Sequence, residues 1–479
     1  MKSFLKTIGA GFITFLYILS CTNDVYEASK SFISNENVEI IANPYVISKD
    51  NAIAAALTYV ERSIESQHTE GSLTEIKSIS TRSAGQGYGR YTSVTSKNYA
   101  VKIEEASNKS KEVRQEIPVY TINYKDENGN NAGFVVMVGD ERISEKALIF
   151  SDDAGASFDM NSRSDADFIE DLIGGYLYKS INLADFNNRV TTRGGTLVIQ
   201  NQPQYNTISY ILTPALNFAH TITPFNKYTP FKGGVRTSAG CTAVAMSAIM
   251  AWHDWPLQGK FPRYTSSTRD TVQVSYDLDP NARDAMLSGN IAYCDSYYPA
   301  AMEYMANLCI ETGYRLNTNY AGADASLASP SNVPAVFAEM GYTSSDTVKY
   351  NISIIENDIK NQVLPVFMAG WKQNITDGGH AYLIYGVMYV TVNSKVEKYI
   401  KLIEGNTTSG IYKVGGVGYV WFNAQMFSID TSDPGYSVPS DEAFYPYRYN
   451  CLLISNIKPN YNKNGSLDAK WKARDLYLF

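Results

Sequence analysis

Apolar and polar positions in the first half of the chain predict helices and strands in mixed order. Apolar residues recur every three or four positions in segment 48–66, which predicts an amphipathic helix. The residues on its apolar face are Ile53, Ala56, Leu57 and Val60. Apolar runs that are typical of strands follow at 118–123, 133–142 and 147–151, with the turn-rich segment 125–131 between the first two. A less regular pattern predicts a helix over 167–181, so this half is expected to be a small α+β domain.

The second half has its clearest pattern after Gly240. The next fifteen residues, Cys241 to Trp255, contain no Gly or Pro, and Pro256 ends the run. Their apolar residues at helical spacing include Ala245, Met246, Ile249 and Trp252. Further on, two glycines release the chain into the aromatic-rich run 380–387. The sequence therefore predicts a helix that starts at Cys241 and a strand that starts at His380.

Polar segments suggest where the chain divides. A chain of 479 residues is longer than one core normally supports. Segment 72–96 is rich in Ser, Thr and Gly and is expected to be an exposed loop, and segment 187–195 is a polar, basic, Gly-containing linker. We expect one domain over 44–190, a second over 195–460 and a C-terminal tail over 461–479. An activating protease can reach such a linker, although an uncut hinge has the same composition.

The first twenty residues predict export. Lys2 and Lys6 precede an apolar run, Ile8 to Leu19, that is too short for an ordinary membrane span but fits a signal peptide over 1–20. Ser20 and Cys21 follow, and this junction resembles the lipobox of bacterial lipoproteins. The resemblance implies that Cys21 is lipidated and that 21–43 is a tether. The alternative is a plain secretory signal with an incidental Cys.

Composition and charge limit the partners and cofactors that we expect for this protein. A net charge of -7 and the lack of a Lys/Arg run argue against nucleic acid. No closely spaced His and Cys set occurs, so no metal or other cofactor is expected. If Cys21 carries lipid and Cys241 is catalytic, an odd number of cysteines remains, and one disulfide is possible but none is required. These are Cys294, Cys309 and Cys451.

The predicted helix start makes the Cys241 thiol a candidate nucleophile. A thiol at a helix N-terminus faces unpaired backbone N–H groups and the positive end of the helix dipole, which favours the thiolate. His253 is about twelve residues further along the same helix and too distant to act as its base. We expect it to pack or to form a surface hydrogen bond. His380, at a strand start, is the stronger partner, because Cys followed downstream by His is the order in papain-like thiol hydrolases.

Several segments resemble the streptopain family of cysteine peptidases in one consistent order. Residues 236–250 and 252–256 resemble its active-site segment, and Gly379-His380-Ala381 matches its histidine motif. Other similar segments are 224–226, 308–314, 320–326 and 338–342. The strand runs 118–123, 133–142 and 147–151 resemble the family's inhibitory propeptide.

The resemblance implies a papain-like α+β peptidase domain, with a helix that carries the Cys and an antiparallel sheet that carries the His. A small α+β propeptide domain would precede it. Cys241 would be the nucleophile, and His380 the general base and acid. The protein would be an exported cysteine endopeptidase zymogen, with protein or peptide substrates and its own propeptide as inhibitor.

Two positions depart from the family pattern. Asn406 can take the place of the Asn that orients the histidine, but Thr407 stands where the family has the Trp that shields it. The family's oxyanion Gln corresponds to Thr221, with His220 beside it, and either can supply a donor. Each of these residues could instead be an ordinary turn or loop residue.

Two alternatives to an active peptidase stay open. A catalytically weakened or inactive relative that binds peptides in the same cleft would explain both departures. A surface lipoprotein for glycan binding or adhesion would explain the anchor and the 36 tyrosines, but it leaves the ordered Cys and His motifs without cause.

Overall fold

A computed structural model describes nineteen stretches of the chain. They are residues 38–60, 92–103, 106–107, 111–126, 128–143, 145–151, 156–159, 166–191, 205–212, 225–253, 258–265, 268–275, 299–322, 326–362, 364–371, 379–392, 395–404, 420–428 and 451–460. No helix in these stretches combines the length and apolar character needed to cross a bilayer.

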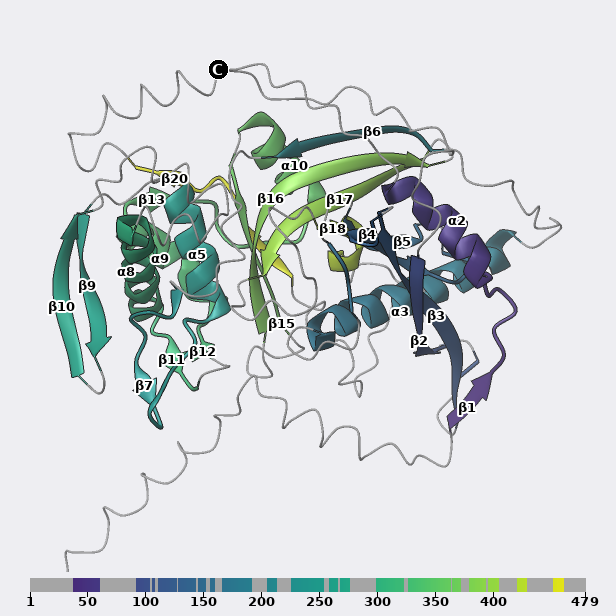
Figure 1. Ribbon diagram of the computed structural model, residues 1–479, viewed down its shortest axis with the longest axis horizontal. Coiled ribbons are helices and arrows are strands. Elements are labelled where there is room, and N and C mark those ends of the chain that lie inside the picture. Colours follow the sequence, from purple (N-terminus) through teal and green to yellow (C-terminus); the bar gives the residue numbers. More distant parts are fainter. Residues whose placement is uncertain are drawn as a thin grey trace, which may run out of the picture.

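One sheet runs through both parts of the molecule, with helices at either end of it in the view of Figure 1. Its order is β1-β3-β4-β5-β18-β17-β16-β15-β19-β14, with β2 also paired to β3 and β6 to β16. All pairs are antiparallel except β1 with β3. The strands are β1 Val38–Ile41, β2 Thr92–Lys102, β3 Glu112–Lys125, β4 Asn131–Val138, β5 Ala147–Ser151, β6 Tyr205–Leu212, β14 Val348–Lys349, β15 Val366–Trp371, β16 Gly379–Val392, β17 Lys395–Glu404, β18 Trp421–Asn423 and β19 Leu452–Ile454.

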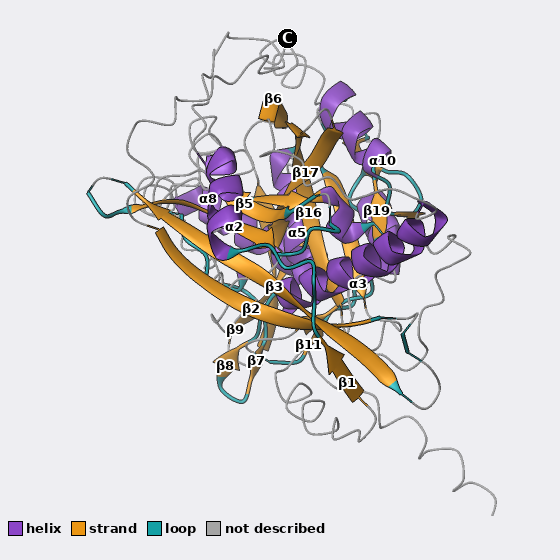
Figure 2. Cartoon of the chain, turned by 90° about the vertical axis from the view of Figure 1, so that its right-hand side faces the viewer, coloured by secondary structure: helices purple, strands orange, loops and turns teal. Residues whose placement is uncertain are grey.

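In the N-terminal part, residues 38–191, the three predicted strand runs are confirmed as β3, β4 and β5. Two further strands lie where loops were expected. β1 falls inside the predicted tether and pairs with β3. β2 begins at Thr92, inside the predicted loop, and pairs with β3 along its whole length (Figure 2). Val94 packs against one core cluster, and Tyr99 and Val101 pack against another on the opposite face of the pleated strand.

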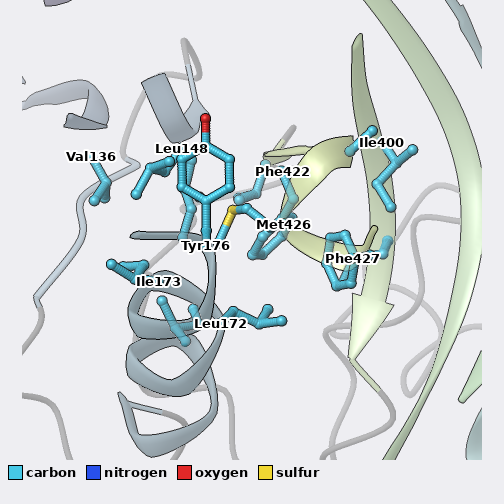
Figure 3. Packing of buried hydrophobic residues seen from close by; sticks show 14 of the residues in the cluster. Val136, Leu148, Leu172, Ile173, Tyr176, Ile400, Phe422, Met426 and Phe427 are labelled. Carbon is cyan, nitrogen blue, oxygen red and sulfur yellow. The ribbon is translucent and has the colours of Figure 1, made fainter. Parts of the chain in front are cut away.

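Two helices cover opposite faces of these strands. α2, Lys49–Val60, packs Ala52 and Ala56 against one face. α3, Ala166–Thr191, packs against the other face with residues that include Ile173 and Tyr176 (Figure 3). The predicted helix 167–181 is therefore ten residues too short at its C-terminal end, and Gly174 and Gly175 do not interrupt it. The first part of the expected exposed linker, 187–191, is helical.

In the C-terminal part, residues 205–460, three helices pack together. α5, Cys241–Trp252, lies against α8, Pro299–Arg315, and α9, Val333–Glu339. This group covers the face of β15 and β16 that carries Phe367, Ala381 and Leu383. Shorter elements are β7 Phe231–Lys232, β8 Val235–Arg236, β9 Gln258–Thr265, β10 Thr268–Ser275, β11 Asn319–Tyr320, β12 Ser326–Leu327, β13 Tyr342–Thr343, β20 Lys458–Pro459, α10 Ile352–Glu356, a π-helical turn Asn357–Asn361, and 3-10 turns Pro330–Asn332 and Ala424–Phe427.

The helix predicted to reach Trp255 ends at Trp252, and His253 follows as its C-cap. His253 is buried, and its Nε2 lies 2.8 Å from the carbonyl oxygen of Ile457. The expected packing role of His253 is therefore observed. The α+β fold class is confirmed.

Candidate active site

Cys241 is the first residue of α5, as the sequence predicted, and Gly240 is the N-cap. Gly240 has φ +87°, a conformation that side chains other than glycine rarely adopt. A Cβ at this position would also lie 3.0 Å from the carbonyl oxygen of Ser326. Only glycine therefore fits directly before the thiol.

Hydrogen bonds from distant segments hold the loop 237–240 that leads into Cys241. Asn226 accepts a hydrogen bond from the backbone N–H of Ala239 through its Oδ1, at 2.7 Å. The Ser326 hydroxyl donates to the carbonyl of Ser238 at 2.6 Å, and the Ser238 N–H donates to the carbonyl of Gly322 at 2.9 Å. The helix start is thus tied to two other parts of the chain. The sequence resemblance covers both segments but gives Asn226 and Ser326 no role.

The environments of two thiols in this region differ. Cys241 is half-buried at the helix start and packs against the core around α5. Cys309, on α8, is fully buried against the same helix, and burial raises the pKa of its thiol to about 12. A buried neutral thiol is inert, whereas a half-exposed thiol at a helix N-terminus can react.

His380 is the second residue of β16 and lies opposite Gly370 of β15. Its ring contacts Tyr382, with the ring centroids 4.9 Å apart. The residue as a whole keeps some exposure, but protein atoms enclose the imidazole, and this burial lowers the pKa of His380 to about 4. The imidazole is therefore neutral at pH 7 in this arrangement and can accept a proton.

The structure packs the helix that carries Cys241 against the strand that carries His380. Ala243 and Val244 of α5 share a core cluster with Ala381 and Leu383 of β16, which flank Tyr382. The other sheet face holds Tyr382 and Ile384 in a second cluster. Cys241 borders the first cluster, and the ring contact with Tyr382 places His380 beside the second.

The remaining predicted site residues lie outside the described residues. These are His220, Thr221, Asn406, Thr407 and Cys21. In the stretches that the structure does describe, no group of three or more His, Cys, Asp or Glu side chains could hold a metal ion. Cys309 forms no disulfide within the part of the chain that the structure describes.

Comparison with known proteins supports the sequence resemblance. Residues 220–403 match the model of the Peptidase C10 family. No curated protein matches the chain. Among solved structures, a prointerpain A fragment from Prevotella intermedia is similar at 15% identity and a TM-score of 0.42, over 75% of this chain and 98% of that one. Active interpain A cysteine protease from the same organism is similar at 17% identity and a TM-score of 0.33, over 51% and 93%.

Proposed function

We propose that the chain is an exported cysteine endopeptidase zymogen of the streptopain type, because residues 220–403 match the model of the Peptidase C10 family. The observation that carries the proposal is the helix-initial Cys241 on α5, packed against the strand that bears His380.

The proposed mechanism uses the neutral imidazole as a base. His380 takes the proton of the Cys241 thiol, and the thiolate sulfur attacks the carbonyl carbon of the scissile peptide bond. The resulting oxyanion accepts a hydrogen bond from the Cys241 N–H, with Thr221 or His220 as the second donor. The imidazolium then protonates the leaving amine. Water, deprotonated by the same imidazole, hydrolyses the thioester and restores the thiol.

The resemblance to the streptopain family makes Asn406 the residue proposed to orient the imidazole. β17 ends at Glu404, which lies opposite Tyr382 in the antiparallel pair with β16. An amide oxygen beside the ring of His380 can accept the second ring N–H and hold the imidazole for proton transfer.

The N-terminal part is proposed to act as the inhibitor, and a cut after α3 is proposed to relieve it. Arg189 lies within α3, and helical backbone resists proteolysis. Arg193 follows the helix and is the better candidate for the cut. Export and lipidation at Cys21 belong to the same proposal, since a surface-anchored protease acts on proteins outside the cell.

One observation favours a second candidate, a peptide-binding relative without strong activity. Burial holds the pKa of His380 near 4. Such a weak base stabilises a thiolate–imidazolium pair poorly. Thr407, at the position where the family has a shielding Trp, points the same way.

Casein hydrolysis by Cys241→Ala and His380→Ala variants tests the proposal. Each substitution should abolish hydrolysis while circular dichroism stays unchanged, because each removes a reacting group from a folded protein. Cys309→Ala is the matched control, since its buried thiol takes no part in the chemistry and activity should persist. Hydrolysis retained by Cys241→Ala, or no hydrolysis by the unaltered protein after a cut following Arg193, would favour the peptide-binding relative.

A further inference from the structure

A glycine in the last turn of α8 lies directly against a tyrosine side chain. A Cβ atom added to Gly313 would overlap the hydroxyl oxygen of Tyr320. The ring carbon that carries this hydroxyl, Cζ, would be 3.4 Å from the same Cβ, which is an ordinary contact. Glycine within a helix costs stability relative to alanine. At Gly313 the missing Cβ leaves room for the Tyr320 hydroxyl.

The way α8 ends explains why the tyrosine returns to this point. Asn317 has φ +55°, and its N–H donates to the carbonyl of Tyr314 at 3.0 Å. The N–H of Thr318 donates to the carbonyl of Gly313 at 2.9 Å. These two bonds around one left-handed residue form a Schellman motif, which stops a helix and turns the chain. Shortly after this turn, Tyr320 lies back against the end of α8.

Tyr320 also belongs to the strand pair that holds the loop before Cys241. β11 and β12 are antiparallel, with Tyr320 opposite Ser326. The Ser326 hydroxyl donates to the carbonyl of Ser238, and the carbonyl of Gly322, which follows β11, accepts the Ser238 N–H. Both backbone groups of Ser238 are therefore held by this strand pair and its connection. A shift of Tyr320 would displace the backbone that leads into the helix start.

α8 is a firm support for this contact because it is fixed to α5, the helix that starts at Cys241. The two helices lie side by side and share one core cluster (Figure 1). Next to Gly313, the Thr312 hydroxyl accepts a hydrogen bond from the Ser247 hydroxyl of α5 at 3.3 Å. A clash at Gly313 would therefore move Tyr320 and its strand more readily than it would move α8.

From these contacts we infer that Gly313 and Tyr320 are positioning residues for Cys241. Their contact fixes β11 and β12, and this strand pair fixes the loop that carries the thiol. The coupling runs through one contiguous set of contacts and involves no contact of either residue with the substrate. The inference rests on the proposed function, because it concerns the rate of the peptidase reaction. A displacement of about 1 Å in a reacting group can lower a rate by about 10²-fold.

A double-mutant cycle in the full-length protein, cut after Arg193, tests this contact. Gly313→Ala should lower the rate of casein hydrolysis by about tenfold or more, because Tyr320 and the loop must move. Tyr320→Phe removes the overlapping oxygen, so the Gly313→Ala/Tyr320→Phe variant should recover most of the lost rate. A purely local effect of alanine on the helix would give no such recovery. Full activity in Gly313→Ala, or no recovery in the double variant, would overturn the inference.

Tyr320→Ala tests the same contact without any change in the helix. It removes the side chain that supports β11 and should also lower the rate of casein hydrolysis, with circular dichroism unchanged. Tyr314→Ala is the matched control, because Tyr314 is on the same helix end but is 47% exposed. It should keep the rate of the unaltered protein. Equal rates in Tyr320→Ala and Tyr314→Ala would count against a positioning role for Tyr320.

Alkylation of Cys241 separates this inference from the proposed function. In the same preparations, the rate constant for modification of Cys241 by iodoacetamide is followed by peptide mass spectrometry. It should fall in Gly313→Ala and recover in the double variant, because the backbone N–H groups that favour the thiolate move with the loop. If the unaltered protein hydrolyses no casein, the proposed function fails, and the alkylation pattern alone decides the inference. Equal alkylation rates in all variants would overturn it.

Discussion

At the scale of single residues, Cys241 and His380 carry the proposed chemistry, and neighbouring side chains hold the loop before Cys241 in place. The thiol of Cys241 was found because glycine before an uninterrupted apolar run predicts a helix start, and His380 because two glycines precede a strand run. Asn226 and Ser326 hold the loop before Cys241 through side-chain bonds to backbone groups. Such bonds have no fixed spacing in sequence, so no pattern could have assigned them.

The buried His380 makes stability depend on pH. Its pKa falls from 6.5 in the unfolded chain to about 4 in the folded one, so folding favours the neutral ring. The contribution is present above pH 6.5 and is lost as the pH falls through 4. It amounts to about 3 kcal/mol. Urea unfolding at pH 7 and pH 4 should therefore show a smaller loss of stability in His380→Gln than in the unaltered protein, by about this amount.

His253→Gln controls for the loss of a buried histidine as such, because His253 is also buried but its ring is bonded to a backbone carbonyl. Its unfolding free energy is measured at the same two pH values. An equal pH effect in His380→Gln and the unaltered protein would show that the imidazole is not enclosed by protein.

At the scale of elements, strong apolar periodicity predicts the helices and strands correctly, whereas strands that form through pairing with distant segments cannot be predicted from it. β3, β4, β5, α2 and α5 lie where apolar patterns predicted them. β1 and β2 do not stand out in the sequence, because β1 has only four residues and β2 is mostly polar, and both are strands through pairing with β3. The extension of α3 through Thr191 was missed because the residues Asn187, Asn188 and Arg189 resemble a linker.

The junction of loop and helix at Gly240 gives a prediction at this scale. Gly240→Ala should lower the rate of peptide hydrolysis by at least about tenfold, because small displacements of a reacting group are costly. It should also destabilise the protein by more than the cost of a left-handed backbone conformation alone, which is typically about 1–2 kcal/mol. The added Cβ meets the Ser326 carbonyl oxygen at 3.0 Å.

Gly234→Ala is the control for Gly240→Ala. Gly234 has a similar φ of +81°, yet its Cβ would meet nothing within 4 Å. The Gly234→Ala variant should lose only the stability that the left-handed backbone conformation costs, and it should keep its peptidase activity. Similar rates in both variants would mean that the contact with Ser326 does not position Cys241.

At the scale of the whole molecule, the sequence predicted two α+β domains, and the structure joins the two parts in one sheet. The signal for this was present in β5. All five residues of Ala147–Ser151 are buried, and a short apolar run without alternation is typical of a strand covered on both faces. What covers it comes from β18, Trp421–Asn423, more than 260 residues later. No local pattern could connect these segments.

Covalent labelling tests directly whether Cys241 is the nucleophile. The chain, cut after α3, is treated with a peptidyl electrophile that reacts with activated thiols, and the adduct is found by peptide mass spectrometry. We expect one adduct, on Cys241, in proportion to the loss of casein hydrolysis, with Cys309 unmodified because burial keeps its thiol neutral. An adduct on another cysteine, or full hydrolysis with Cys241 completely labelled, would contradict this assignment.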